Sequence, residues 1–140
     1  MLVGIVELVI ATRSTATEMQ VIRTYNARGV VITLLAPTGQ WTTGENTFVM
    51  EFDSAPQKRL IDVGAPTLIA GLPIAGDQLV RVTARLARGD AVGRYIGTIT
   101  LPRAGDWTVT ATFNSPEGKQ SATFPVSAGP RSNKPKGAHR

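Results

Sequence analysis

The sequence predicts an all-β fold, an antiparallel sandwich of two sheets. Two runs, 95–101 and 107–113, alternate apolar and polar or small residues, as strands with one buried face do. Sheets with one face in water are antiparallel. Pro102 to Asp106 join the two runs with turn-forming residues, which predicts a β-hairpin. Its inward side chains are expected to be Trp107, Val109, Ala111 and Phe113, with Thr108, Thr110 and Thr112 facing water.

Five further segments carry strand patterns separated by turn residues. We expect strands at 30–35, 47–53, 60–69, 79–86 and 120–126, with turns at 36–40, 43–45, 55–57 and 89–93. Pro125 restricts the last strand to a sheet edge, because proline cannot donate to a ladder. About seven short strands at this spacing predict an immunoglobulin-like β-sandwich.

The 140 residues, 42% of them hydrophobic, suffice for one ordinary core, so we expect one domain. Residues 1–28 are interpreted as an apolar segment followed by a polar linker, 29–128 as the sandwich and 129–140 as a disordered basic tail. The apolar run from Leu2 to Thr12 is about half the ~20 residues of a membrane span, and Glu7 interrupts it. Three interpretations stay open: an added strand, a short amphipathic helix, or the stub of a longer export or anchor segment.

The net charge of +5 is concentrated at one end of the chain. Residues 130–140 hold Arg131, Lys134, Lys136 and Arg140 and no acid, whereas the rest holds eleven basic and ten acidic residues. A basic stripe interleaved with aromatics, typical of nucleic-acid binders, is missing. We therefore expect no specific nucleic-acid partner.

Catalytic and metal-ligating side chains are scarce. There is no cysteine, and the single histidine, His139, lies in the tail, which excludes disulfides and thiolate metal sites. Glu51 and Asp53 share a strand face, where two acids are expected to face solvent. No glycine-rich phosphate loop precedes a helix. Because convergent titratable groups are lacking, we expect no catalytic residues and no enzyme.

Five short motifs give the chain a family resemblance: 35–41 (LAPTGQW), 44–48 (GENTF), 60–64 (LIDVG), 93–95 (GRY) and 104–107 (AGDW). In this order they resemble the YtkA-like, or FixH-like, family of extracytoplasmic bacterial β-sandwich domains over about residues 29–128. The resemblance implies a periplasmic or cell-surface location beside copper-efflux or oxidase-assembly systems. The residues that form its fold signature are Gly44, Asn46, Gly93, Tyr95, Gly105 and Trp107.

The resemblance also raises the question of copper. In relatives with a suspected metal role, the segment after the third strand is a loop rich in methionine, whose thioether suits Cu(I). Here residues 70–77 contain no methionine; Met19 falls in the linker, and Met50 is expected in the core. No metal ligand is assigned, and a copper-handling domain with a degenerate or partner-completed site remains the alternative.

The leading hypothesis is a non-catalytic extracytoplasmic module that binds a protein partner in the cell envelope and is tethered to a membrane, or presented near one, by its N-terminal end. Trp41, beside a turn and outside the alternating pattern, is the aromatic residue expected to be exposed. Leu72 and Ile74 form either a hydrophobic partner surface or part of the core. These three residues are the candidate interface. Asn46 is expected to bond local backbone and fix its turn, and Tyr95 and Trp107 are expected in the core.

Overall fold

The computed structural model describes residues 18–131, which form two facing β-sheets and no helix. No helix in this part of the chain could cross a membrane. The strands are β1 (Gln20–Ala27), β2 (Val30–Ala36), β3 (Trp41–Thr42), β4 (Gly44–Ser54), β5 (Arg59–Leu60), β6 (Thr67–Pro73), β7 (Leu79–Thr83), β8 (Arg85–Arg88), β9 (Arg94–Leu101), β10 (Gly105–Ser115) and β11 (Gly118–Gly129).

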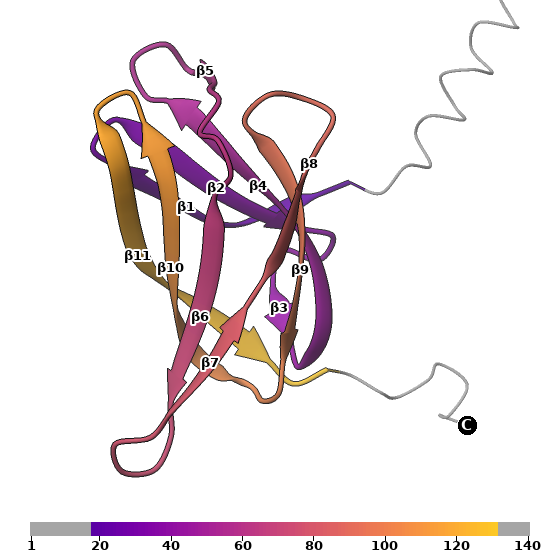
Figure 1. The fold of residues 1–140 in the computed structure, drawn as a ribbon. Coiled ribbons are helices and arrows are strands. Elements are labelled where there is room, and N and C mark those ends of the chain that lie inside the picture. The colour runs from indigo at the N-terminus through magenta and orange to yellow at the C-terminus, as the bar shows by residue number, and fades with distance from the viewer. Residues whose placement is uncertain (1–17, 132–140) are drawn as a thin grey trace, which may run out of the picture.

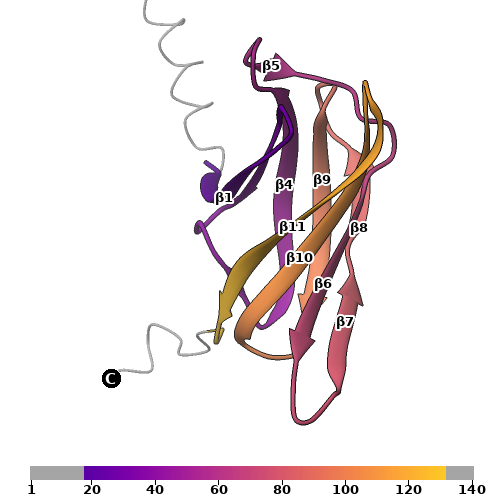
Figure 2. The same cartoon turned by 90° about the vertical axis from the view of Figure 1, so that its left-hand side faces the viewer.

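One sheet, called sheet A here, has the order β1-β2-β4-β9-β8, with β5 added beside β4. The other, sheet B, has the order β3-β11-β10-β6-β7. Every pairing is antiparallel except the short parallel one between β3 and β11. Figures 1 and 2 show the two layers, with the β6–β7 hairpin extending from one end. The all-β sandwich predicted from the alternating pattern is therefore confirmed.

The core fills the space between the sheets with aromatic side chains. Trp41, Phe48, Phe52 and Trp107 are fully buried, and Phe113 is 2% exposed. The rings of Phe52 and Phe113, one from each sheet, have centroids 5.1 Å apart. Such contacts add to the hydrophobic stabilisation from burial. The inward set predicted for 107–113 is confirmed.

The predicted hairpin between 95–101 and 107–113 is wrong. β9 belongs to sheet A and β10 to sheet B, so residues 102–104 carry the chain from one layer to the other. Leu101 and Trp107, on either side of this connection, are both fully buried. Both strands present apolar faces to the same core, so β9 and β10 face each other across the core and are not neighbours in one sheet. The alternating pattern looks the same for either arrangement.

Residues 18–131 form eleven strands where about seven were predicted, since two predicted strands are divided and two further strands, β1 and β3, are not among the predicted ones. The expected strand at 60–69 is β5 and β6, separated by a segment in which Val63 is buried. The expected strand at 79–86 bends at Ala84, so that β7 joins sheet B and β8 joins sheet A. Strands that change sheets at a bend close the corner of a sandwich. The inward pattern at Val80, Val82, Ala84 and Leu86 continues through the bend.

Part of the predicted linker is a strand. β1 occupies residues 20–27 and pairs with β2, with a register shift between Val21 and Arg23. Only Ala27 of this strand is buried, so its sequence shows no sustained alternation of apolar and polar residues. Residues 1–17, on which the anchor interpretation depends, lie outside the described residues.

The predicted start of the disordered tail is also wrong. β11 continues to Gly129, and Arg131 donates hydrogen bonds from Nε to the Thr43 carbonyl (2.8 Å) and from Nη2 to the Glu45 carbonyl (2.6 Å). Ordered structure therefore extends at least to Arg131. The remaining tail, including His139, lies outside the described residues.

Candidate binding surfaces

An apolar row crosses the outer face of sheet A. The strand registers align Val21 with Leu35, Leu35 with Val49, Val49 with Ile96, and Ile96 with Ala87. Residues directly opposite each other in an antiparallel pair lie on the same face. Val21 is 55% and Ile96 48% exposed, Ala87 is exposed, and Leu35 and Val49 are half-buried. We call these five residues the apolar row.

Charged residues flank the apolar row on one side. Arg94 lies opposite Glu51 and bonds its Oε2 through Nε at 2.7 Å, while Nη1 reaches Asp90 Oδ1 at 2.9 Å. Hydrogen bonds to Asp90 and Glu51 raise the pKa of the Arg94 guanidinium. Glu51 and Asp53 do share the outer face, but Glu51 is held by an ion pair that the sequence pattern did not reveal.

Asp53 is the unusual member of this charged group. Its Oδ1 is buried without a hydrogen-bond partner among the described residues. Burial raises the pKa of its carboxyl, Glu51 raises it further, and Arg94 acts in the opposite direction. Asp53 is thus a carboxyl group with a raised pKa that lies beside the Arg94–Glu51 ion pair on the outer face of sheet A.

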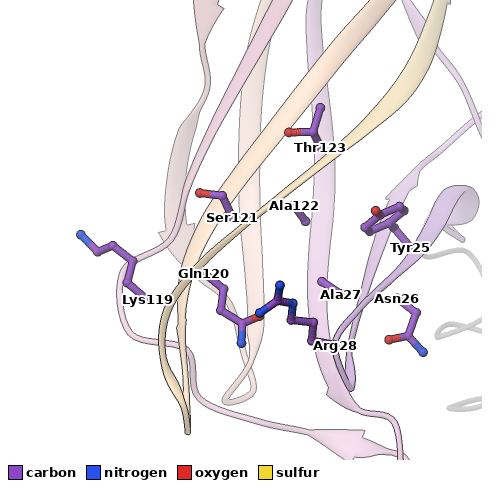
Figure 3. Close-up of a pocket in the computed structure, with 9 residues that line it drawn as sticks. All are labelled: Tyr25, Asn26, Ala27, Arg28, Lys119, Gln120, Ser121, Ala122 and Thr123. Atoms are coloured by element: carbon purple, nitrogen blue, oxygen red, sulfur yellow. The ribbon is translucent and has the colours of Figure 1, made fainter.

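A second surface is the seam between β1 and β11, the strands at neighbouring edges of the two sheets. A groove of about 550 Å³ lies there, lined by Tyr25, Asn26, Ala27, Arg28, Lys119, Gln120, Ser121, Ala122 and Thr123. Figure 3 shows Gln120 and Ala122 projecting toward β1, and Lys119 and Ser121 pointing the other way. A second groove of about 320 Å³ continues the seam beside Ile22, Arg23, Pro125 and Val126.

Two local features shape the seam. The ring of Tyr25 stacks on Phe124, with centroids 5.3 Å apart, and so bridges the two sheets between the grooves. At the end of β1, Arg28 and Gly29 have φ angles of 53° and 90°, as in the tight two-residue turns of hairpins. The Gly29 amide donates to Asn26 Oδ1 at 3.0 Å. These contacts hold the β1 wall of the seam in place.

The three predicted interface residues do not form one surface. Trp41 is fully buried, with its ring 5.4 Å from that of Phe48, so its predicted exposure is wrong. The reason is that β3 pairs with the end of β11 and directs the indole into the core. Leu72 is 7% exposed, and Ile74 is partly buried against the core. For Leu72, the core alternative is the one observed.

The fold-signature residues hold loops and strand ends. Asn46 accepts from the Thr42 amide at 2.9 Å and donates to the carbonyls of Thr42 and Gly44 at 2.7 and 3.0 Å. Its predicted role in fixing the turn is confirmed. Gly44 has a φ of 94°, in the left-handed region that favours glycine.

The other signature residues pack tightly. Gly93 has a φ of 84°, and a Cβ there would lie 2.5 Å from the carbonyl oxygen of Ile61. At Gly105 a Cβ would lie 2.9 Å from Leu72 Cδ1. Tyr95 and Trp107 are in the core, as predicted. The Tyr95 hydroxyl donates to the Gly64 carbonyl at 2.6 Å, and burial raises the pKa of this phenol.

The described part of the chain offers no group of three or more His, Cys, Asp and Glu side chains that could hold a metal ion. Met50 is fully buried, in agreement with its predicted place in the core, and Met19 lies just before β1. No observation assigns ligands to the copper-handling alternative, which stays a prediction.

The fold and these surfaces define a two-sheet β-sandwich with an unpartnered sheet face and an open seam. No family model, curated protein or solved structure matches the chain. The resemblance to YtkA-like domains therefore stays an expectation from the sequence motifs.

Sequence reasoning missed both surfaces for identifiable reasons. Residues of the apolar row are separated by up to 75 positions in the sequence, and only strand order brings them together. The sequence does contain one local signal: Ile96 occupies a polar-face position in a strand whose other residues on that face are Arg94, Thr98 and Thr100. The seam depends on β1, which the sequence pattern predicts to be part of a polar linker.

Proposed function

We propose that this chain is a non-catalytic interaction module of the cell envelope that binds a protein partner through the outer face of sheet A. The observation that carries the proposal is the apolar row. In a sandwich, the outer face of each sheet is exposed to solvent and ordinarily carries polar residues. On sheet A, apolar residues instead line up across five strands. Contiguous exposed apolar surface on a soluble domain commonly marks an interaction site.

The energetics favour a partner at this row. Covering the exposed parts of Val21 and Ile96 would contribute about 1 kcal/mol each from apolar burial alone. Arg94, Glu51 and Asp90 beside the row supply a charged rim. An apolar centre with a polar rim is the usual anatomy of a protein interface.

The immunoglobulin-like relationship and the envelope location belong to the same proposal. In its support, β11 accepts the short parallel strand β3, and the order β11-β10-β6 resembles the strand order G-F-C of immunoglobulin sheets. The sequence motifs that resemble YtkA-like domains support an extracytoplasmic module, and the apolar run from Leu2 to Ile10 ahead of a polar segment supports an N-terminal end at the membrane. Fractionation of the tagged protein tests the location: recovery with the envelope is expected, and recovery in the cytosol contradicts it.

A double substitution tests the interface. Val21→Thr with Ile96→Thr keeps strand-compatible residues while making the row polar. A photoreactive residue placed at Ala87 would crosslink the protein to its partner in native membranes. We expect the double substitution to lower the crosslinked yield at least about tenfold and to leave the melting temperature of the protein unchanged.

The matched control is Leu79→Thr, which also replaces an exposed apolar residue (48% exposed) but on β7, in the other sheet. An equal loss in this control would contradict the assignment of the row. Sedimentation of the purified protein is the second check. A concentration-dependent dimer abolished by the row variant would assign the face to a second copy and contradict a separate partner.

A further inference from the structure

The seam carries an inference independent of the apolar row. β1 ends sheet A, and among the residues that the structure describes the adjacent edge of β11 is paired only at Ala128 and Gly129, where β3 lies. No pairing joins β1 to β11 within residues 18–131. Between Lys119 and Val126, β11 therefore presents an unpaired edge beside the two grooves. Unpaired edges are sites where another chain can add a strand.

The free backbone groups of this edge can be identified. The Thr43 amide donates to the Gly129 carbonyl at 3.0 Å, so Gly129 directs its backbone to the β3 side. The β10–β11 register is unbroken from Ser115↔Gly118 to Gly105↔Ala128, and backbone direction alternates along a strand. Ser121 and Thr123 therefore direct both amide and carbonyl to the open edge.

The side chains of Ser121 and Thr123 form no hydrogen bonds with these outward-facing backbone amides and carbonyls. The hydroxyls of Thr123 and Ser121 instead contact those of Thr110 and Thr112, each at 3.2 Å, on the outer face of sheet B. Pro125, two positions further, has a carbonyl but no amide to offer. The edge thus provides about five residues of alternating donors and acceptors, ending where Pro125 limits further pairing.

The walls of the seam are basic. Arg23 and Arg28 line the two grooves, and Lys119 lies at the rim of the larger one. No Asp or Glu lines either groove, and none of the three cations forms an ion pair with another residue of 18–131. Glu117 lines only the adjoining cleft at the hairpin end. The positive charge favours an acidic occupant.

We propose that the edge of β11 between Lys119 and Pro125 binds an extended acidic segment of a partner polypeptide by strand addition. The spacing of free amides and carbonyls matches another peptide backbone, and the three cations receive its carboxylates. A second copy of this chain is disfavoured, because two such edges would bring like charges together and each carries a proline. This site lies on a different sheet from the apolar row.

Two synthetic peptides test the proposal on the full chain. The probe is Glu-Val-Thr-Val-Glu-Val-Glu-amide with fluorescein attached to its N-terminal amine. The comparison peptide is the same one N-methylated at alternate residues, which removes the amides that a strand must donate. We expect saturable binding of the first by fluorescence polarisation, weakened by salt, and at least about tenfold weaker binding of the second. Equal binding of the two would overturn strand addition.

Variants locate the site. Ser121→Pro removes one outward amide without touching the ladder to β10, and Ser121→Ala removes only the hydroxyl. We expect the proline variant to weaken binding about tenfold and the alanine variant to bind as the unsubstituted chain does. The melting temperature of both variants shows whether they fold. If Ser121→Pro does not fold, the charge variants described next and amide chemical shifts decide the question, with shifts expected along 119–125.

The charge requirement has its own variant. Arg28→Asn with Lys119→Gln neutralises two cations, and asparagine suits the left-handed conformation of position 28. We expect weaker binding of the acidic peptide, and Arg81→Gln, on exposed β7, is the control without effect. Three outcomes would each overturn the proposal. The peptide could fail to bind saturably, it could change amide chemical shifts at the apolar row, or a dimer of the chain could show the same chemical-shift changes without peptide. None of these outcomes would remove the proposed role of the row, which is tested by different residues.

Discussion

At the scale of single residues, Asn46 shows how one buried amide holds a loop. Its side chain satisfies the Thr42 amide and two carbonyls where the chain passes from β3 in one sheet to β4 in the other. Asn46→Ala would leave these backbone groups without partners in a part-buried site. We expect a loss of about 1–3 kcal/mol in the free energy of unfolding, measured by urea denaturation. Thr47→Ala, at the next and exposed position, is the control, and an equal loss there would contradict this role.

Asp53 gives the molecule a pH dependence with a definite sign. Because burial raises its pKa in the folded state, the folded protein binds this proton more tightly than the unfolded chain does. The contribution of Asp53 to stability is therefore greatest below the unfolded pKa and is lost as the pH rises through the folded pKa.

The substitution Asp53→Asn should remove this loss of stability at higher pH. We expect its melting temperature at neutral pH to exceed that of the unsubstituted protein by about 2–5 °C, with the difference shrinking as the pH is lowered to about 4. Thermal denaturation across this range measures it. The exposed Asp77→Asn serves as control, and a gain for Asp53→Asn that grows toward acid pH would refute the argument.

At the scale of elements, β6 and its hairpin show what replaced the predicted apolar loop. Leu72 is buried and contacts the Gly105 region, whereas Ile74 beyond the end of β6 is only partly covered. Leu72→Ser should therefore lower the free energy of unfolding by about 2–4 kcal/mol, and Ile74→Ser by less. Chemical denaturation of the two single variants measures the difference. Equal small losses would mean that Leu72 is not a core residue.

Elements with strong alternation could be predicted from the sequence, and those defined by tertiary context could not. The inward faces of β4, β10 and β11 follow from period-2 patterns that include Phe48, Val109 and Phe124. β1 has one buried residue, and β3 and β5 have two residues each, so no periodicity could reveal them. The bend at Ala84 is invisible because the alternation continues through it.

At the scale of the whole molecule, fold class was predictable while strand pairing was not. The alternation of 95–101 and 107–113 specifies which side chains face the core, but a hairpin and a connection between sheets satisfy it equally. Both candidate surfaces depend on that missing information, since the apolar row needs the order of sheet A and the seam needs its terminal strand. Trp41 was misplaced for the same reason, because its burial follows from pairing with β11.

The bend at Ala84 makes the two sides of the sandwich mechanically unequal. On that side one continuous chain, β7 into β8, belongs to both sheets and acts as a hinge. On the opposite side β1 and β11 are not paired with each other within residues 18–131, and no strand there continues from one sheet into the other. At the end formed by the turns at 28–29 and 116–117, the sheets are joined by residues 61–66, where the Asn114 amide donates to the Val63 carbonyl at 3.2 Å.

Thermal fluctuations should therefore separate the two sheets more along the seam between β1 and β11 than along β7 and β8. We expect amide hydrogens of the β1–β2 ladder to exchange with solvent faster than those of the β8–β9 ladder, although both ladders lie at an edge of sheet A. Native-state hydrogen exchange measures the two rates, and the reverse order would contradict the hinge. A strand bound along β11 would then hold the two sheets together at the seam. It would slow amide hydrogen exchange in β1 as well as at its own contacts with β11.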